Sequence, residues 1–143
     1  MQPSSISPVN LLVYAVEDSA DYRFLLQQVF QMFLPEYTLH LFEDGQAFYQ
    51  MLDILDKPGL LLLDFRMPVI NGCELATLIR QRADWKYIPI IVMSNTREPD
   101  EIASCYKAGA NSFLVKPTDI ESMRQVMQSL CFYWFELNKP VVG

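Results

Sequence analysis

Four short apolar runs in this chain each end at a polar residue of a different chemical kind. The runs cover residues 11–16, 60–63, 89–93 and 112–115, and longer segments with helical spacing separate them. Strands buried on both faces are continuously apolar rather than alternating, so this pattern is typical of a parallel sheet with helices on each side. Residues 38–42 alternate and predict one more strand.

Helix signals fill the segments between the predicted strands. Ser19 is a capping residue before the first of them, Pro99 is well placed in the first turn of the fourth, and Gly109 ends that helix. We expect helices over five segments: from the capping residues 18–21 to residue 33, then 45–55, 74–82, 99–109 and 118–137.

The alternation of strands and helices predicts one α/β domain. We expect a doubly wound, flavodoxin-like sheet of five parallel strands with five helices over residues 9–137. Residues 1–8 are expected to form a flexible leader, and residues 138–143 a short tail.

Charge and composition exclude several classes of protein. The net charge of −6 argues against direct nucleic-acid binding, because phosphate backbones require basic surface. Apolar stretches are too short to span a membrane, and no signal peptide opens the chain, so we expect a cytoplasmic protein. Cys73, Cys105 and Cys131 are odd in number and scattered, which predicts small, buried, reduced thiols.

The polar residues at the strand ends predict a phosphate-and-metal site. Glu17 and Asp18 follow the first run, Asp64 the second, Ser94 the third and Lys116 the fourth. The carboxyl ends of parallel strands meet at one edge, where open α/β sheets bind ligands. Mg²⁺ relieves repulsion between clustered carboxylates, and a carboxylate can attack a phosphoryl donor. Taken singly, an Asp or a Lys at a strand end is usually a cap or a solvated residue.

These residues resemble the receiver domain of two-component response regulators over about residues 9–137. The resemblance rests on motifs in the same order as in that family, namely Val16-Glu17-Asp18, Leu63-Asp64-Phe65-Arg66-Met67-Pro68 with Gly72, Met93-Ser94, Gly109-Ala110 and Phe113-Leu114-Val115-Lys116-Pro117.

The resemblance implies a role for each site residue. Asp64 would accept the phosphoryl group and would bind Mg²⁺ together with Asp18 and the backbone carbonyl of Arg66, while Glu17 would contribute through water. Lys116 would contact the phosphoryl group. The donor would be a sensor histidine kinase or a histidine phosphotransfer protein, and the domain would phosphorylate itself and slowly lose the phosphoryl group without being an enzyme in the usual sense.

The switch residues depart from the family pattern. Ser94 stands where Thr is more frequent, and Phe113 stands where Tyr is frequent, so the hydroxyl and the ring are kept but a methyl and a phenol are lost. Asn95 stands where a small residue is usual, and it could narrow access to the phosphoryl group or hydrogen-bond to it. These departures leave the lifetime of the phosphorylated state open.

Other functions compete with a stand-alone, chemotaxis-receiver-like switch. A phosphorelay shuttle would use the same residues. A Mg²⁺-dependent phosphatase of the haloacid-dehalogenase type needs a second Asp two residues after the nucleophile, where this chain has Arg66. A pseudo-receiver that acts only as a scaffold is disfavoured by the intact pocket.

The aromatic end of the last predicted helix indicates a contact surface. Met123, Met127 and Trp134 belong to one stripe that a sheet would bury, whereas Phe132 points away from it and Phe135 lies beyond its edge. Only residues 138–143 follow, so we expect the output to be a protein contact or phosphotransfer. A homodimer through the fourth helix, fifth strand and fifth helix is favoured, with a fold-back of the aromatic end as the alternative. The aromatic end and residues 138–140 also resemble, more weakly, the C-termini of small receivers that partner phytochrome-type or other hybrid kinases.

Overall fold

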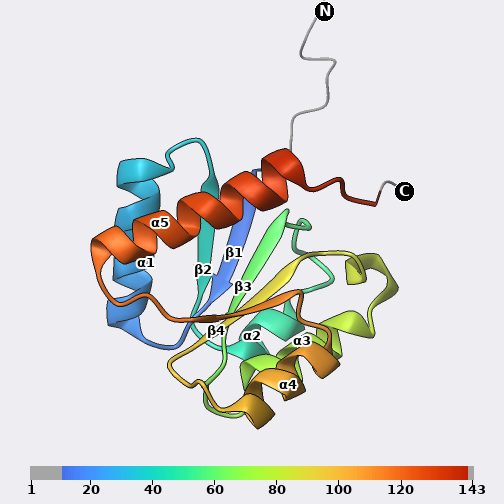
Figure 1. The fold of residues 1–143 in the computed structure, drawn as a ribbon. Helices are drawn as coiled ribbons and strands as arrows, with labels where there is room; N and C mark the ends of the chain where they lie inside the picture. The colour runs from blue at the N-terminus through green and yellow to red at the C-terminus, as the bar shows by residue number, and fades with distance from the viewer. Residues whose placement is uncertain (1–10, 142–143) are drawn as a thin grey trace, which may run out of the picture.

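A five-stranded parallel sheet forms the centre of the computed structural model, which describes residues 11–141 (Figure 1). The strand order is β2-β1-β3-β4-β5, so the chain winds in both directions from β1, as the apolar runs predicted. The predicted leader at 1–8 lies outside the described residues. The strands are β1 (Leu12–Val16), β2 (Thr38–Phe42), β3 (Leu60–Asp64), β4 (Ile90–Ser94) and β5 (Ser112–Val115).

Helices cover both faces of the sheet, which confirms the doubly wound architecture (Figure 1). Alternate residues of β3 divide between the two layers: Leu60 and Leu62 pack with α1 and α5, whereas Leu61 and Leu63 pack with α2, α3 and α4. All four leucines are fully or almost fully buried, which explains the continuous apolar run. The helices are α1 (Ala20–Phe33), α2 (Gly45–Gln50), α3 (Gly72–Arg80), α4 (Pro99–Ala108) and α5 (Ile120–Cys131), with short helical turns η2 (Ala83–Trp85) and η3 (Phe132–Leu137).

Side-chain caps set most helix boundaries. Ser19 caps α1 by accepting a hydrogen bond from the Tyr22 backbone N–H at 3.2 Å, as expected. Asn71 and Glu74 form a reciprocal capping box, so α3 begins at Gly72, before the predicted position.

The second helix is shorter than predicted. After Gln50 the chain makes overlapping turns, in which the backbone N–H of Met51 donates to Phe48 and that of Leu52 donates to Tyr49. These bonds span three residues rather than four, so the apolar side chains of this segment reach the core without a regular α-helix.

The aromatic C-terminal segment folds partly onto its own core. α5 gives way at Phe132 to the π-helical turn η3. The ring of Phe135 lies 5.1 Å from that of Tyr37 and is partly buried against the α1/α5 layer, so placing it on an exposed contact surface was wrong. Phe132 is 56 % exposed, as predicted. The stripe with Met123, Met127 and Trp134 faces the sheet side.

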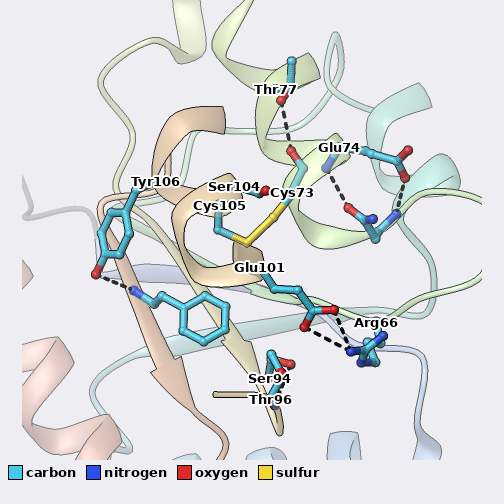
Figure 2. The surroundings of a disulfide bond; sticks show 12 residues. Arg66, Cys73, Glu74, Thr77, Ser94, Thr96, Glu101, Ser104, Cys105 and Tyr106 are labelled. Atoms are coloured by element: carbon cyan, nitrogen blue, oxygen red, sulfur yellow. Dashed lines mark hydrogen bonds and ion pairs between the residues drawn. A yellow bond between two sulfur atoms is a disulfide. The ribbon is translucent and has the colours of Figure 1, made fainter. Parts of the chain in front are cut away.

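The cysteines differ from the prediction of three reduced thiols. Cys73 of α3 and Cys105 of α4 form a disulfide, and only Cys131 is a free, buried thiol (Figure 2). The two joined residues are 32 positions apart in sequence, and their Cα atoms lie 4.9 Å apart because α3 packs against α4. The spacing of Cys73 and Cys105 in the sequence does not predict that they meet. Within residues 11–141, no helix has the length and apolar character needed to cross a bilayer.

Candidate functional site

Three carboxylates meet at the carboxyl edge of the sheet. Val16 pairs with Leu63 across β1 and β3, so Glu17, just after β1, lies beside Asp64, the last residue of β3. One oxygen from each of Glu17, Asp18 and Asp64 lies within 4.8 Å of the others. Glu17 and Asp64 are buried, whereas Asp18 is exposed at the rim. Clustered hard oxygen ligands beside open solvent fit a divalent metal ion such as Mg²⁺.

A single ammonium group bridges the two buried carboxylates. Lys116 Nζ lies 2.8 Å from Glu17 Oε1 and 3.1 Å from Asp64 Oδ1. Lys116 follows β5, which pairs with β4, so its side chain reaches across β4 toward β1 and β3. The pocket therefore keeps one positive charge in contact with both acids.

Two α1 residues support this pair, although the sequence singled out neither of them for the site. The Tyr22 ring lies 4.3 Å from Lys116 Nζ, and its hydroxyl donates to the Pro117 carbonyl at 2.8 Å. Burial, with the nearby carboxylates, raises the pKa of the Tyr22 phenol, so the ring remains neutral. Arg23 donates to the Glu17 backbone carbonyl at 2.8 Å. The only sequence signal for Tyr22 and Arg23 was their position in the first turn of the helix that follows Glu17 and Asp18.

The Asp64 carboxyl is electrostatically unusual. Burial, followed by the Glu17 charge, raises its pKa from 3.8 to about 7, against the opposing attraction of Lys116. One ammonium cannot neutralise two buried carboxylates and also the exposed Asp18. The uncompensated negative charge is a second reason why a divalent cation fits this cluster.

Ser94 precedes α4 in the chain and Phe113 follows it, and the two residues belong to the neighbouring strands β4 and β5. Ser94 ends β4 and is almost fully buried, and its hydroxyl accepts a hydrogen bond from the Thr96 backbone N–H at 3.1 Å. Phe113 of β5 is partly buried, with its ring 6.5 Å from that of Phe65. Asn95 is exposed beyond the end of β4.

The loop after Asp64 forms the mouth of the site. A recess of about 500 Å³ lies here, lined in part by Asp18, Phe65 and Arg66. The Arg66 guanidinium contacts both carboxylate oxygens of Glu101 on α4, at 2.9 and 3.0 Å (Figure 2). A Cβ on Gly72 would lie 2.5 Å from the Asp64 carbonyl oxygen, so the loop can return this close only at glycine.

Comparisons with known proteins identify the family of this chain. The sequence model of the response regulator receiver domain matches residues 13–128. Response regulator Rcp1 of Synechocystis sp. is 30 % identical over 132 residues, which cover 87 % of this chain and 89 % of that protein.

Solved structures show the same fold. The Mn²⁺-bound form of Rcp1 has a TM-score of 0.77 and 26 % identity, covering 92 % of this chain and 99 % of that chain. The phosphorylated cyanobacterial phytochrome response regulator RcpA has a TM-score of 0.80 and 21 % identity, covering 92 % and 98 %. Because the family match spans most of the sequence, the chain belongs to the response regulator receiver domains, the signalling switches of two-component systems.

Proposed function

We propose that Asp64 accepts a phosphoryl group from a sensor histidine kinase or a histidine phosphotransfer protein in a Mg²⁺-dependent reaction. The observation that carries the proposal is the contact of Lys116 with both Asp64 and Glu17 beside the exposed Asp18. This combination supplies a carboxylate nucleophile, a cation ligand set and a positive charge for phosphoryl oxygens in one place.

The residues divide the chemistry between them. An oxygen of Asp64 forms the new bond to phosphorus while the donor's bond to phosphorus breaks, and the histidine nitrogen of the donor leaves with the electron pair. Lys116 already contacts Asp64 Oδ1, so its ammonium is positioned to stabilise charge on the transferred group. Asp18, Asp64, the Arg66 backbone carbonyl and, through water, Glu17 would hold Mg²⁺, which neutralises phosphoryl oxygens when bound.

Ser94 and Phe113 are the proposed switch residues. The Ser94 hydroxyl would turn from Thr96 toward the phosphoryl group, and the partly buried ring of Phe113 would move further inward. The surface formed by α4, β5 and α5 would change with them and alter affinity for a partner protein. Phe132 is an exposed aromatic that would be available for a homodimer near this surface. The proposed setting is cytoplasmic.

Phosphorylation with acetyl phosphate and Mg²⁺ tests the central assignment. Intact mass should show one added phosphoryl group on the wild-type protein, none on Asp64→Asn, and a strongly reduced yield when a chelator removes Mg²⁺. Lys116→Met is a matched change in the same pocket and should also lower the yield. The same phosphoryl gain in Asp64→Asn would show that the acceptor is another residue.

Incubation of the phosphorylated chain with a purified histidine phosphotransfer protein distinguishes a terminal switch from a phosphorelay intermediate. Transfer of the phosphoryl group from Asp64 back to histidine would identify a relay intermediate, whereas retention on Asp64 would favour a terminal switch.

A further inference from the structure

The Cys73–Cys105 disulfide joins α3 and α4, the two α-helices that the chain forms between Asp64 and β5 (Figure 2). Cys73 lies in the first turn of α3, just after the Asp64 loop, and Cys105 lies in the second half of α4. The bond is therefore the only covalent tie, among the described residues, between α4 and the helix that follows the acceptor strand.

Weaker contacts hold the rest of α4. At its start Glu101 pairs with Arg66 of the acceptor loop, and toward its end the Tyr106 hydroxyl accepts a hydrogen bond from the Phe113 backbone N–H at 3.1 Å. Arg80 of α3 donates to the Gly109 carbonyl at 2.9 Å. Exposed ion pairs such as Arg66–Glu101 stabilise little, so the disulfide is the strongest single link that holds α4 in place.

The disulfide belongs to the buried cluster against which Phe113 packs. Cys73, Cys105 and Phe65 belong to one buried cluster, and the Phe113 ring packs against that cluster. Any inward movement of this ring must be accommodated by the α3–α4 contact. A covalent bond across that contact limits how far α4 can move, whereas two thiols would permit a small separation.

We propose that the Cys73 and Cys105 pair is a redox modification site, and that its disulfide restrains α4. The consequence for signalling rests on the proposed function: the oxidised form would resist the rearrangement that follows phosphorylation of Asp64, and the reduced form would permit it. Disulfides in a cytoplasmic setting are usually transient, catalytic or redox-sensing rather than permanent. Cys131 is buried against the other face of the sheet and takes no part.

The chemistry balances with a peroxide as oxidant and a small dithiol as reductant. The thiolate of Cys73 attacks the peroxide, giving a sulfenic acid and water, and Cys105 then displaces the second water as the disulfide forms. The two thiols lose two electrons and the peroxide gains them. In reduction, a thiolate of the dithiol attacks Cys73, which keeps 8 % exposure while Cys105 keeps none, and Cys105 leaves as thiolate. The second sulfur of the dithiol then attacks the first, which closes the dithiol into a cyclic disulfide and releases Cys73 as a thiolate.

Thiol alkylation followed by intact mass tests the modification itself. Wild-type protein treated with hydrogen peroxide should retain one alkylatable thiol after denaturation, and protein treated with dithiothreitol should show three. Cys131→Ser is the matched control and should lose exactly the thiol that remains after oxidation. Three alkylatable thiols after peroxide treatment, or a disulfide that includes Cys131, would overturn the assignment.

Hydrogen exchange tests the restraint on α4 without any phosphoryl group. Amides of α4 should exchange at least about ten-fold more slowly in the oxidised wild type than in the reduced wild type, because opening α4 requires separation from α3. Cys105→Ala should behave like the reduced form under both conditions, and circular dichroism should confirm that it folds. Because both redox forms have the same sequence, equal exchange in the two wild-type samples would overturn the restraint.

Beryllofluoride titration links the redox site to the proposed function. With Mg²⁺ present, half-saturation should require at least about five-fold more beryllofluoride in the oxidised form than in the reduced form. Binding of equal strength in the two forms would overturn the signalling consequence. Absence of binding in both forms would instead count against the proposed phosphoryl site, and the α4 exchange result would still decide the restraint.

Discussion

Burial and a neighbouring negative charge both disfavour the ionised form of Asp64. Its side chain is 6 % exposed, it lies beside the buried Glu17, and it shares the single ammonium of Lys116. A group that is more easily protonated in the folded protein than in the unfolded chain makes folding depend on pH. In the metal-free protein Asp64 is such a group.

The stability of the metal-free protein should therefore fall as pH rises from about 4 to about 7. In this window folded Asp64 retains a proton that the unfolded chain has released, so raising the pH favours unfolding. A pKa raised from 3.8 to about 7 corresponds to a loss on the order of 4 kcal/mol, complete above about pH 7. Urea unfolding in the presence of a chelator at several pH values measures it.

Asp64→Asn is the matched control for this pH dependence. The amide carries no charge, so the variant should lose this part of the slope and should be more stable than the wild type at pH 8. An unchanged slope in the variant would assign the pH dependence to other groups.

At the scale of the elements, the two parts of the C-terminal helical segment, α5 and η3, differ in what they contact. α5 packs on the sheet through Met123 and Met127, and the π-helical turn η3 then brings Phe135 against Tyr37. Phe132, three residues earlier, remains in solvent. The aromatic segment is thus divided between a core contact and an exposed surface, and only the exposed part is available to a partner.

Phe135→Ala and Phe132→Ala should separate these two roles. Removing the Phe135 ring should lower the free energy of unfolding by about 2 kcal/mol, because a partly filled cavity replaces its contact with Tyr37. Phe132→Ala should change it by less than about 0.5 kcal/mol. Urea unfolding measures both values.

Sizing chromatography with beryllofluoride then tests association. The proposed homodimer should be weakened by Phe132→Ala while its fold is unaffected. Equal destabilisation by the two substitutions would contradict the division of the segment.

At the scale of the whole molecule, a bound cation would offset repulsion within a chain of net charge −6. Folding brings Asp64 to the adjacent Glu17 and Asp18, so the proposed Mg²⁺ site would exist only in the folded state. Ligands that bind only the folded state stabilise it in proportion to the logarithm of their concentration.

Mg²⁺ at about 100 times its dissociation constant should raise the free energy of unfolding by about 2.7 kcal/mol. Asp18→Asn should remove most of this gain, because Asp18 contributes the exposed carboxylate at the rim of the cluster. Urea unfolding at the same Mg²⁺ concentration compares the two proteins, and Na⁺ at matched ionic strength controls for screening. Equal stabilisation of the wild type and the variant would argue against a site at these carboxylates.

The sheet and the acid cluster were accessible from sequence because both depend on local pattern. A run such as 60–63 must be buried on both faces, and the polar residue that follows it must then stand at the common edge. Parallel register brings four separate strand ends to one site, so the sequence pattern is enough to group Asp64, Glu17 and Lys116.

Contacts between helices were decided only by the tertiary structure. Cys73 and Cys105 meet because α3 and α4 pack together, and Phe135 is partly covered because η3 places it against Tyr37. Tyr22 contacts Lys116 because the first turn of α1 lies beside the residue that follows β5. Each depends on the angle and distance between elements far apart in the chain. Periodicity assigns a residue to a face of its own element, but which neighbour meets that face is determined by packing of the whole domain.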